Sequence, residues 1–119
     1  MLAVRHYASV ETESPAPGVT MRVVLGPNEG APTFNLRVFE IQPGASTPHH
    51  SHWWEHEVYV LSGKGVACSE DGEVSVSEGT AVLVPGEAAH HFTNTGTELL
   101  RFICLVPQAW LEGVRCAPG

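Results

Sequence analysis

Short apolar runs separated by glycine- and proline-rich turns make up most of this sequence. Apolar and polar positions alternate over 34–41 and 90–95, which is typical of strands with one buried face. A Glu-Asp-Gly turn at 70–72 predicts a hairpin. Residues 10–18 are predicted as a loop, and 109–114 as a last helical turn or an edge segment. The predicted strands span 3–7, 19–25, 34–41, 57–61, 66–69, 73–76, 81–84, 90–95 and 99–106.

Many short strands with almost no helical periodicity predict an all-β fold, either a sandwich or a barrel. The 119 residues include 12 glycines and 9 prolines, spread without a repeat period, and this favours short elements joined by turns. Apolar residues make up 43% of the chain and charged residues 16%, as in an ordinary folded protein. We therefore expect one domain over residues 1–119.

Composition excludes several classes of partner. With a net charge of −7 and only 6 lysines and arginines, the chain has no basic stripe for nucleic acid or anionic membrane. The N-terminus shows no signal-peptide pattern, and no apolar run approaches the roughly 20 residues that span a bilayer. Cys68, Cys104 and Cys116 are widely spaced, without a CxxC pair, and we expect them to be reduced. These features predict a cytoplasmic protein whose partner is a small molecule.

Histidines are concentrated in two segments. Four of the seven lie between residues 49 and 56, and two more lie at 90–91. His50 and His52 share one face of an extended segment, His56 has the same even spacing, and His90 lies on another predicted strand. Cross-strand pairing could bring these four imidazoles around one metal ion, because neutral imidazole is the commonest protein metal ligand.

Two further histidines are each next in sequence to a proposed ligand and therefore fall on the opposite face of an extended segment. By alternation, His49 and His91 point away from the proposed ion, and we interpret them as surface residues or as residues that support the ligands. The alternative for the whole cluster is a histidine-lined pocket without a metal. No catalytic acid or base is evident from the sequence.

The spacing of the histidines and of the glycines around them resembles that of a known family. The pattern Gly44-x5-His50-x-His52-x3-His56-x6-Gly63, followed by Gly79-x5-Pro85-Gly86-x3-His90-x3-Asn94, resembles the two motifs of the cupin superfamily, here at 44–63 and 79–94. The resemblance implies an RmlC-like jelly-roll β-barrel, also called a double-stranded β-helix. It also implies one divalent metal ion bound in the mouth of the barrel.

One residue departs from the usual cupin pattern. His56 stands where most cupins have a glutamate ligand, and the string around it resembles a subgroup of small cupins with four histidine ligands, some of which bind manganese. The resemblance therefore implies His50, His52, His56 and His90 as ligands. Manganese is the favoured ion, with iron, zinc, nickel or copper as alternatives. In that subgroup a proline usually stands where this chain has Trp53.

Further expectations concern the pocket and its chemistry. Trp54, Phe102 and Cys104 are expected to line the pocket. Four neutral imidazoles would leave the ion its full +2 charge. The leading hypothesis is an oxidoreductase of dioxygenase type acting on a small organic substrate. The alternatives are a small-molecule or metal-binding sensor without turnover and a metal-assisted isomerase or lyase. We also expect a homodimer, and metal binding that weakens as the pH falls through about 6.

Overall fold

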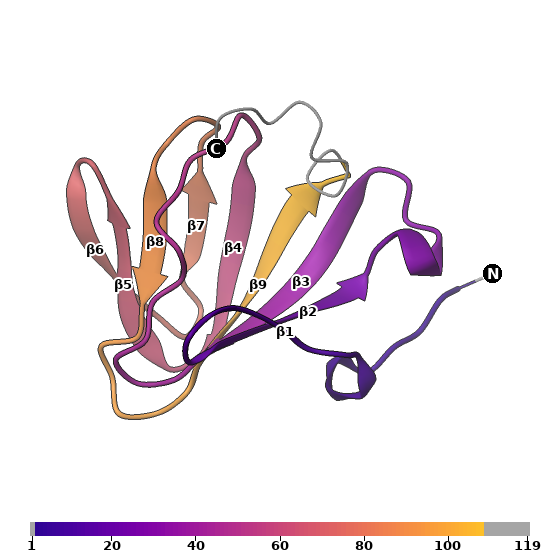
Figure 1. Ribbon diagram of the computed structural model, residues 1–119, viewed down its shortest axis with the longest axis horizontal. Helices are drawn as coiled ribbons and strands as arrows, with labels where there is room; N and C mark the ends of the chain where they lie inside the picture. Colours follow the sequence, from indigo (N-terminus) through magenta and orange to yellow (C-terminus); the bar gives the residue numbers. More distant parts are fainter. Residues whose placement is uncertain (1, 109–119) are drawn as a thin grey trace.

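The computed structural model describes residues 2–108, which form two antiparallel sheets (Figure 1). The larger sheet has the strand order β1-β2-β3-β9-β4-β7, and the smaller has the order β6-β5-β8. The strands are β1 (Glu13–Ala16), β2 (Val19–Leu25), β3 (Phe34–Ile41), β4 (His56–Ser62), β5 (Lys64–Ser69), β6 (Gly72–Ser77), β7 (Ala81–Val84), β8 (His90–Thr93) and β9 (Leu100–Pro107). Two single 3-10 turns, η1 (Tyr7–Ser9) and η2 (Pro27–Glu29), precede β1 and β3. The all-β prediction is confirmed.

The core lies between the two sheets. Strands β3 and β9 pair so that Phe39 stands opposite Phe102, and the two rings stack with centroids 5.1 Å apart. Phe92 of the smaller sheet reaches the same cluster, with its ring centroid 5.0 Å from that of Phe102. Aromatic side chains thus join the sheets through their inner faces, because alternate positions of each strand point into the core.

The N-terminal segment differs from the prediction. Residues 3–7 pair with no strand of either sheet in the described part of the chain, and the 3-10 turn η1 begins at Tyr7 instead. The guanidinium groups of Arg22 and Arg101 lie over the Tyr7 ring, 5.3 and 5.2 Å from its centroid. Both arginines pair with Glu40 on the outer face of the larger sheet. Arg5 of the same segment pairs with Glu29, so side-chain contacts rather than a strand ladder hold the segment.

The predicted loop at 10–18 is also wrong, because it contains the edge strand β1. Glu13 pairs with Met21 of β2, and the register shifts between Glu13 and Ala16. Pro15 is tolerated because an edge strand leaves one side of its backbone unpaired. Most of β1 is exposed, so its sequence lacks the apolar alternation on which the strand prediction depended.

Other elements agree closely with the sequence. Strands 34–41 and 81–84 have the predicted bounds, and the hairpin turn at 70–72 joins β5 to β6. The element predicted at 109–114 lies outside the described residues. No helix in residues 2–108 is long and apolar enough to cross a membrane.

Candidate metal centre

Backbone pairing brings the two histidine segments together. Residues 44–50 run beside β8, and the bonds Gly44 N–Asn94 O and Thr47 N–Phe92 O, both 2.9 Å, set their register. At the end of this ladder His50 and His90 exchange backbone hydrogen bonds of 3.2 and 3.0 Å. The side chain of Asn94 donates to the carbonyls of Ile41 and Glu98, both at 2.7 Å, which fixes the end of β8.

The other two histidines are placed by the turn that leads into β4. His52 stacks on Trp54, with ring centroids 4.2 Å apart and planes 9° apart. His56 is the first residue of β4. Gly86 lies so close to this turn that a Cβ there would overlap the carbonyl oxygen of Trp53, so the turn after β7 packs directly on the backbone before His56.

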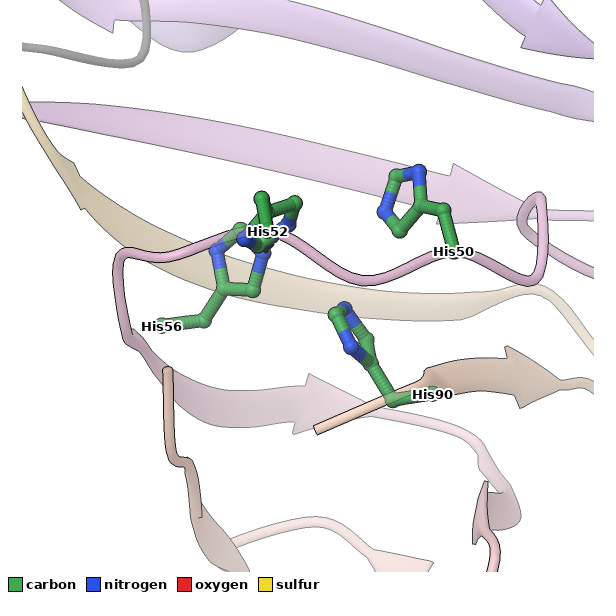
Figure 2. Close-up of side chains that lie close together, drawn as sticks. All are labelled: His50, His52, His56 and His90. Atoms are coloured by element: carbon green, nitrogen blue, oxygen red, sulfur yellow. Dashed lines mark hydrogen bonds between the residues drawn. The ribbon is translucent and has the colours of Figure 1, made fainter. Parts of the chain in front are cut away.

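The four predicted ligands converge. Figure 2 shows the imidazole rings turned toward one another, and one ring nitrogen from each of His50, His52, His56 and His90 lies within 4.8 Å of the others. His52, His56 and His90 are buried, whereas His50 is exposed. We call these four residues the tetrad. Its members come from one loop and from both sheets.

His49 and His91 lie outside the tetrad. They contact each other, with their Nδ1 atoms 2.7 Å apart, and His49 is exposed. Alternation along the chain thus separates the two sets of histidines, as the sequence predicted.

The donor set fits a divalent ion. The Nδ1 atoms of His52 and His90 lie 3.1 Å from the Trp54 carbonyl oxygen and 2.8 Å from the Ala88 carbonyl oxygen. A carbonyl only accepts, so both Nδ1 atoms carry hydrogen and both Nε2 atoms keep a lone pair. The Nε2 atoms of His52 and His56 are 2.9 Å apart. Adjacent nitrogen ligands about 2.1 Å from one ion lie about 3 Å apart when they subtend a right angle.

Burial keeps the tetrad neutral. Desolvation, with smaller contributions from neighbouring imidazoles and Arg37, lowers the pKa of His50 from 6.5 to about 4 and that of His56 to about 2. The pKa values of His52 and His90 are also lowered, mainly by burial. Neutral imidazole is the form that donates a lone pair to a metal, so the free site is ready to bind near neutral pH.

These shifts change the expected pH dependence of metal binding. A proton competes with the ion only when the pH approaches the pKa of the free ligand, and burial has moved those pKa values below 6.5. We expect the apparent affinity for Zn²⁺ or Mn²⁺ to change little between about pH 8 and pH 6, and to fall at lower pH. Competition titrations against a chelator of known pH dependence measure this. A steep loss between about pH 7 and pH 6, as for ordinary histidines, would contradict it.

The tetrad forms part of the wall of a cavity of about 470 Å³. Its other walls are largely apolar and include Met21, Phe39, Phe92 and the three residues predicted to line the pocket, Trp54, Phe102 and Cys104. Only two charged side chains line it among the described residues, Glu13 from β1 and Arg37 from β3. Such a cavity suits a small and mainly apolar organic molecule.

Arg37 and Cys104 contact the tetrad from behind His56. Arg37 is 5% exposed, and its Nη2 lies 3.1 Å from Cys104 Sγ and 3.4 Å from His56 Nδ1. The same Nδ1 is 3.3 Å from Cys104 Sγ. Burial raises the pKa of the Cys104 thiol, although Arg37 acts in the opposite direction. Cys104 and Cys68 are free thiols, both buried.

The sequence analysis did not identify the two charged residues of the cavity, Arg37 and Glu13. Arg37 shares its parity with Phe39 and Ile41, so a charged residue in a core position of a predicted strand was a visible signal. Glu13 carried no such signal, because its segment was interpreted as a loop. Its pairing with Met21, a cavity residue, places it on the inner side of β1.

Comparisons with known proteins identify relatives of this arrangement. Residues 37–106 match the family model described as Cupin domain. The polyketide cyclase RemF from Streptomyces resistomycificus superposes with a TM-score of 0.83 at 32% identity, covering 91% of this chain and 80% of that one. A cupin-2 domain structure from Rhodospirillum rubrum superposes with a TM-score of 0.77 at 26% identity, covering 90% and 75% of the two chains.

Curated relatives are longer than this chain. A 1-methylthio-D-xylulose 5-phosphate methylsulfurylase from Rhodospirillum rubrum is 32% identical over 81% of this chain, but the match spans 60% of that protein. A protein of Methanocaldococcus jannaschii is 27% identical over 51% of this chain and 50% of its own length. The chain thus spans between half and three fifths of the curated relatives it matches.

Proposed function

Because this chain belongs to the cupin family, we propose that it is a metal-dependent enzyme for a small, apolar carbonyl compound, whose tetrad holds one divalent ion. The observation that carries this proposal is four imidazole nitrogens within 4.8 Å of one another, in the wall of a largely apolar cavity. Manganese is the favoured ion because the four-histidine subgroup that the sequence resembles includes manganese-binding members, and iron, zinc, nickel or copper are alternatives because imidazole suits all four.

The cavity favours an apolar substrate over a sugar phosphate. A phosphate dianion needs cationic or amide donors that face it. The one arginine that lines the cavity, Arg37, is 5% exposed and directs Nη2 at the Cys104 sulfur and Nη1 at the Met21 sulfur, 3.1 and 3.6 Å away. Glu13 adds a negative charge to the same cavity. The relative named for a xylulose phosphate substrate is therefore a weaker guide to the substrate than the polyketide cyclase.

The side chains around the tetrad have distinct roles in this proposal. A divalent ion in the tetrad supplies positive charge that stabilises negative charge developing on a substrate oxygen. Trp54 lines the cavity and stacks on the His52 ring, so it fixes the orientation of that ligand. Met21, Phe39 and Phe102 exclude water and hold the apolar part of the substrate.

Glu13 is the proton acceptor in this proposal. It is the one side-chain carboxyl group that lines the cavity in the described part of the chain, and it lies on the exposed edge strand β1. Its Oε takes a proton from the carbon next to the carbonyl, and the electron pair of the broken C–H bond moves into that carbonyl. The carbon then attacks a second carbonyl of the same substrate, and Glu13 returns the proton to the resulting oxygen. No oxidant is consumed.

The experiment that tests this function is proton exchange under anaerobic conditions. Metal-loaded protein in D₂O is incubated with 2-hydroxyacetophenone and with aryl β-ketoesters, and NMR follows the loss of the hydrogen next to the carbonyl. We expect exchange above the rate of the metal-free protein, without dioxygen. Absence of both exchange and turnover with manganese, iron, zinc, nickel and copper would overturn the proposal.

A dioxygenase is the second candidate. The observation that favours it is the exposed position of His50, which leaves the tetrad open on the cavity side. Oxygen uptake by the metal-loaded protein with catechols, flavonols or diketones would support this reaction, and activity that persists without dioxygen would exclude it. Tight retention of a ligand without exchange, turnover or oxygen uptake would instead indicate a sensor.

A further inference from the structure

The four tetrad histidines do not share one kind of support. For a neutral histidine to bind an ion through one ring nitrogen, its hydrogen must lie on the other nitrogen. In His52 and His90 a backbone carbonyl accepts that hydrogen from Nδ1. In His56 the Nδ1 atom faces two side chains instead, Cys104 and Arg37.

These two side chains favour opposite tautomers of His56. The Arg37 guanidinium only donates, so it pairs with an Nδ1 that has a lone pair, and the hydrogen of His56 then lies on Nε2. That tautomer directs its N–H at His52 Nε2, 2.9 Å away, and cannot bind an ion through Nε2. The Cys104 sulfur, 3.3 Å from Nδ1, can accept a hydrogen and so favours the other tautomer.

Cys104 has the capacity for this contact. Its sulfur also accepts a hydrogen bond from Arg37 Nη2 at 3.1 Å, and its own hydrogen is directed at the Leu105 carbonyl oxygen, 4.0 Å from Sγ. With Arg37 engaged by the sulfur, the guanidinium competes less for His56 Nδ1. Cys104 is 4% exposed, so water does not replace it as the acceptor.

We propose that Cys104 is a positioning residue of the metal centre, because its sulfur accepts the Nδ1 hydrogen of His56 and thereby leaves Nε2 open to the ion. The inference rests on the proposed function, in that it assumes the tetrad binds an ion. It assigns to a thiol the role that backbone carbonyls have for His52 and His90.

Four variants test this role. Cys104→Ala and Cys104→Val both remove the acceptor, and valine keeps most of the side-chain volume. Cys104→Ser keeps an acceptor, and Cys68→Ala removes the other described buried thiol, which is hydrogen-bonded to Glu73 and is not one of the clustered donors. Loss of a residue that supports a metal ligand typically weakens binding about 10- to 100-fold. We expect that loss of Zn²⁺ affinity in the first two variants, a value within a few-fold of wild type in Cys104→Ser, and no change in Cys68→Ala.

A second measurement reads the tautomer without any metal. Nitrogen-15 NMR of the metal-free protein distinguishes the protonated ring nitrogen of His56 from the unprotonated one. We expect the fraction with hydrogen on Nδ1 to fall in Cys104→Ala and Cys104→Val and to recover in Cys104→Ser. Unchanged tautomer and affinity in the alanine and valine variants would overturn the role of Cys104. Failure of the wild-type protein to bind any divalent ion would instead overturn the proposed function.

Discussion

Replacing His56 by alanine is expected to lower the affinity for a divalent ion by about a hundredfold or more. A four-ligand site binds with an apparent free energy of about 10–16 kcal/mol, so each ligand accounts for about 3 kcal/mol when the four share it equally. His56 is buried and lies at the start of β4, and its ring cannot be replaced by a neighbour of the same strand because Glu57 points outward. Element analysis and chelator competition measure the loss.

His49→Ala is the matched control for this prediction. His49 lies in the same histidine-rich segment, 49–56, but its ring contacts His91 and is not part of the tetrad. We expect its metal content to equal that of the wild-type protein. Equal metal content in His56→Ala and His49→Ala would show that the ion, if bound, does not use the tetrad.

Replacing Glu13 by glutamine is expected to lower kcat by about 10²- to 10⁴-fold, the usual contribution of a positioned acid or base. The amide has the shape of the carboxylate but cannot take a proton at neutral pH. Metal affinity should remain unchanged, because Glu13 is not one of the clustered donors. The proton-exchange assay with 2-hydroxyacetophenone measures the rate for both proteins under the same metal loading.

Glu11→Gln controls for the loss of negative charge near the same strand. Glu11 is exposed, precedes β1 and does not line the cavity. Its exchange rate should stay within about twofold of wild type, in line with the small effects of surface substitutions. A Glu13→Gln protein that exchanges as fast as Glu11→Gln would exclude Glu13 as the proton acceptor.

Local patterns were sufficient to predict most of the fold. Strand 34–41 is bounded by turn residues and alternates in polarity, and both signals lie within the segment itself. The spacing of the two histidine motifs, read against the cupin pattern, likewise pointed to the four residues that the structure brings together. In each case the information is local or is contained in a known spacing.

Two features could not be predicted from such local signals: the pairing of the edge strand β1 and the contacts between side chains on different strands. Strand β1 exists because β2 offers it a partner, and its own exposed residues carry no strand pattern. The environment of His56 depends on Cys104, 48 positions away in the sequence. Such contacts follow from the register of β3, β4 and β9, which no single segment determines.

The origin of the tetrad residues has a consequence for the lifetime of the protein. Two come from the loop at 44–55, one from the larger sheet and one from the smaller, so an ion would act as a cross-link between the layers. An ion that binds only the folded chain stabilises it by about 4 kcal/mol when its free concentration is a thousand times Kd. Metal supply would then set how often the layers separate, and with it the rate of proteolysis and the abundance of the protein.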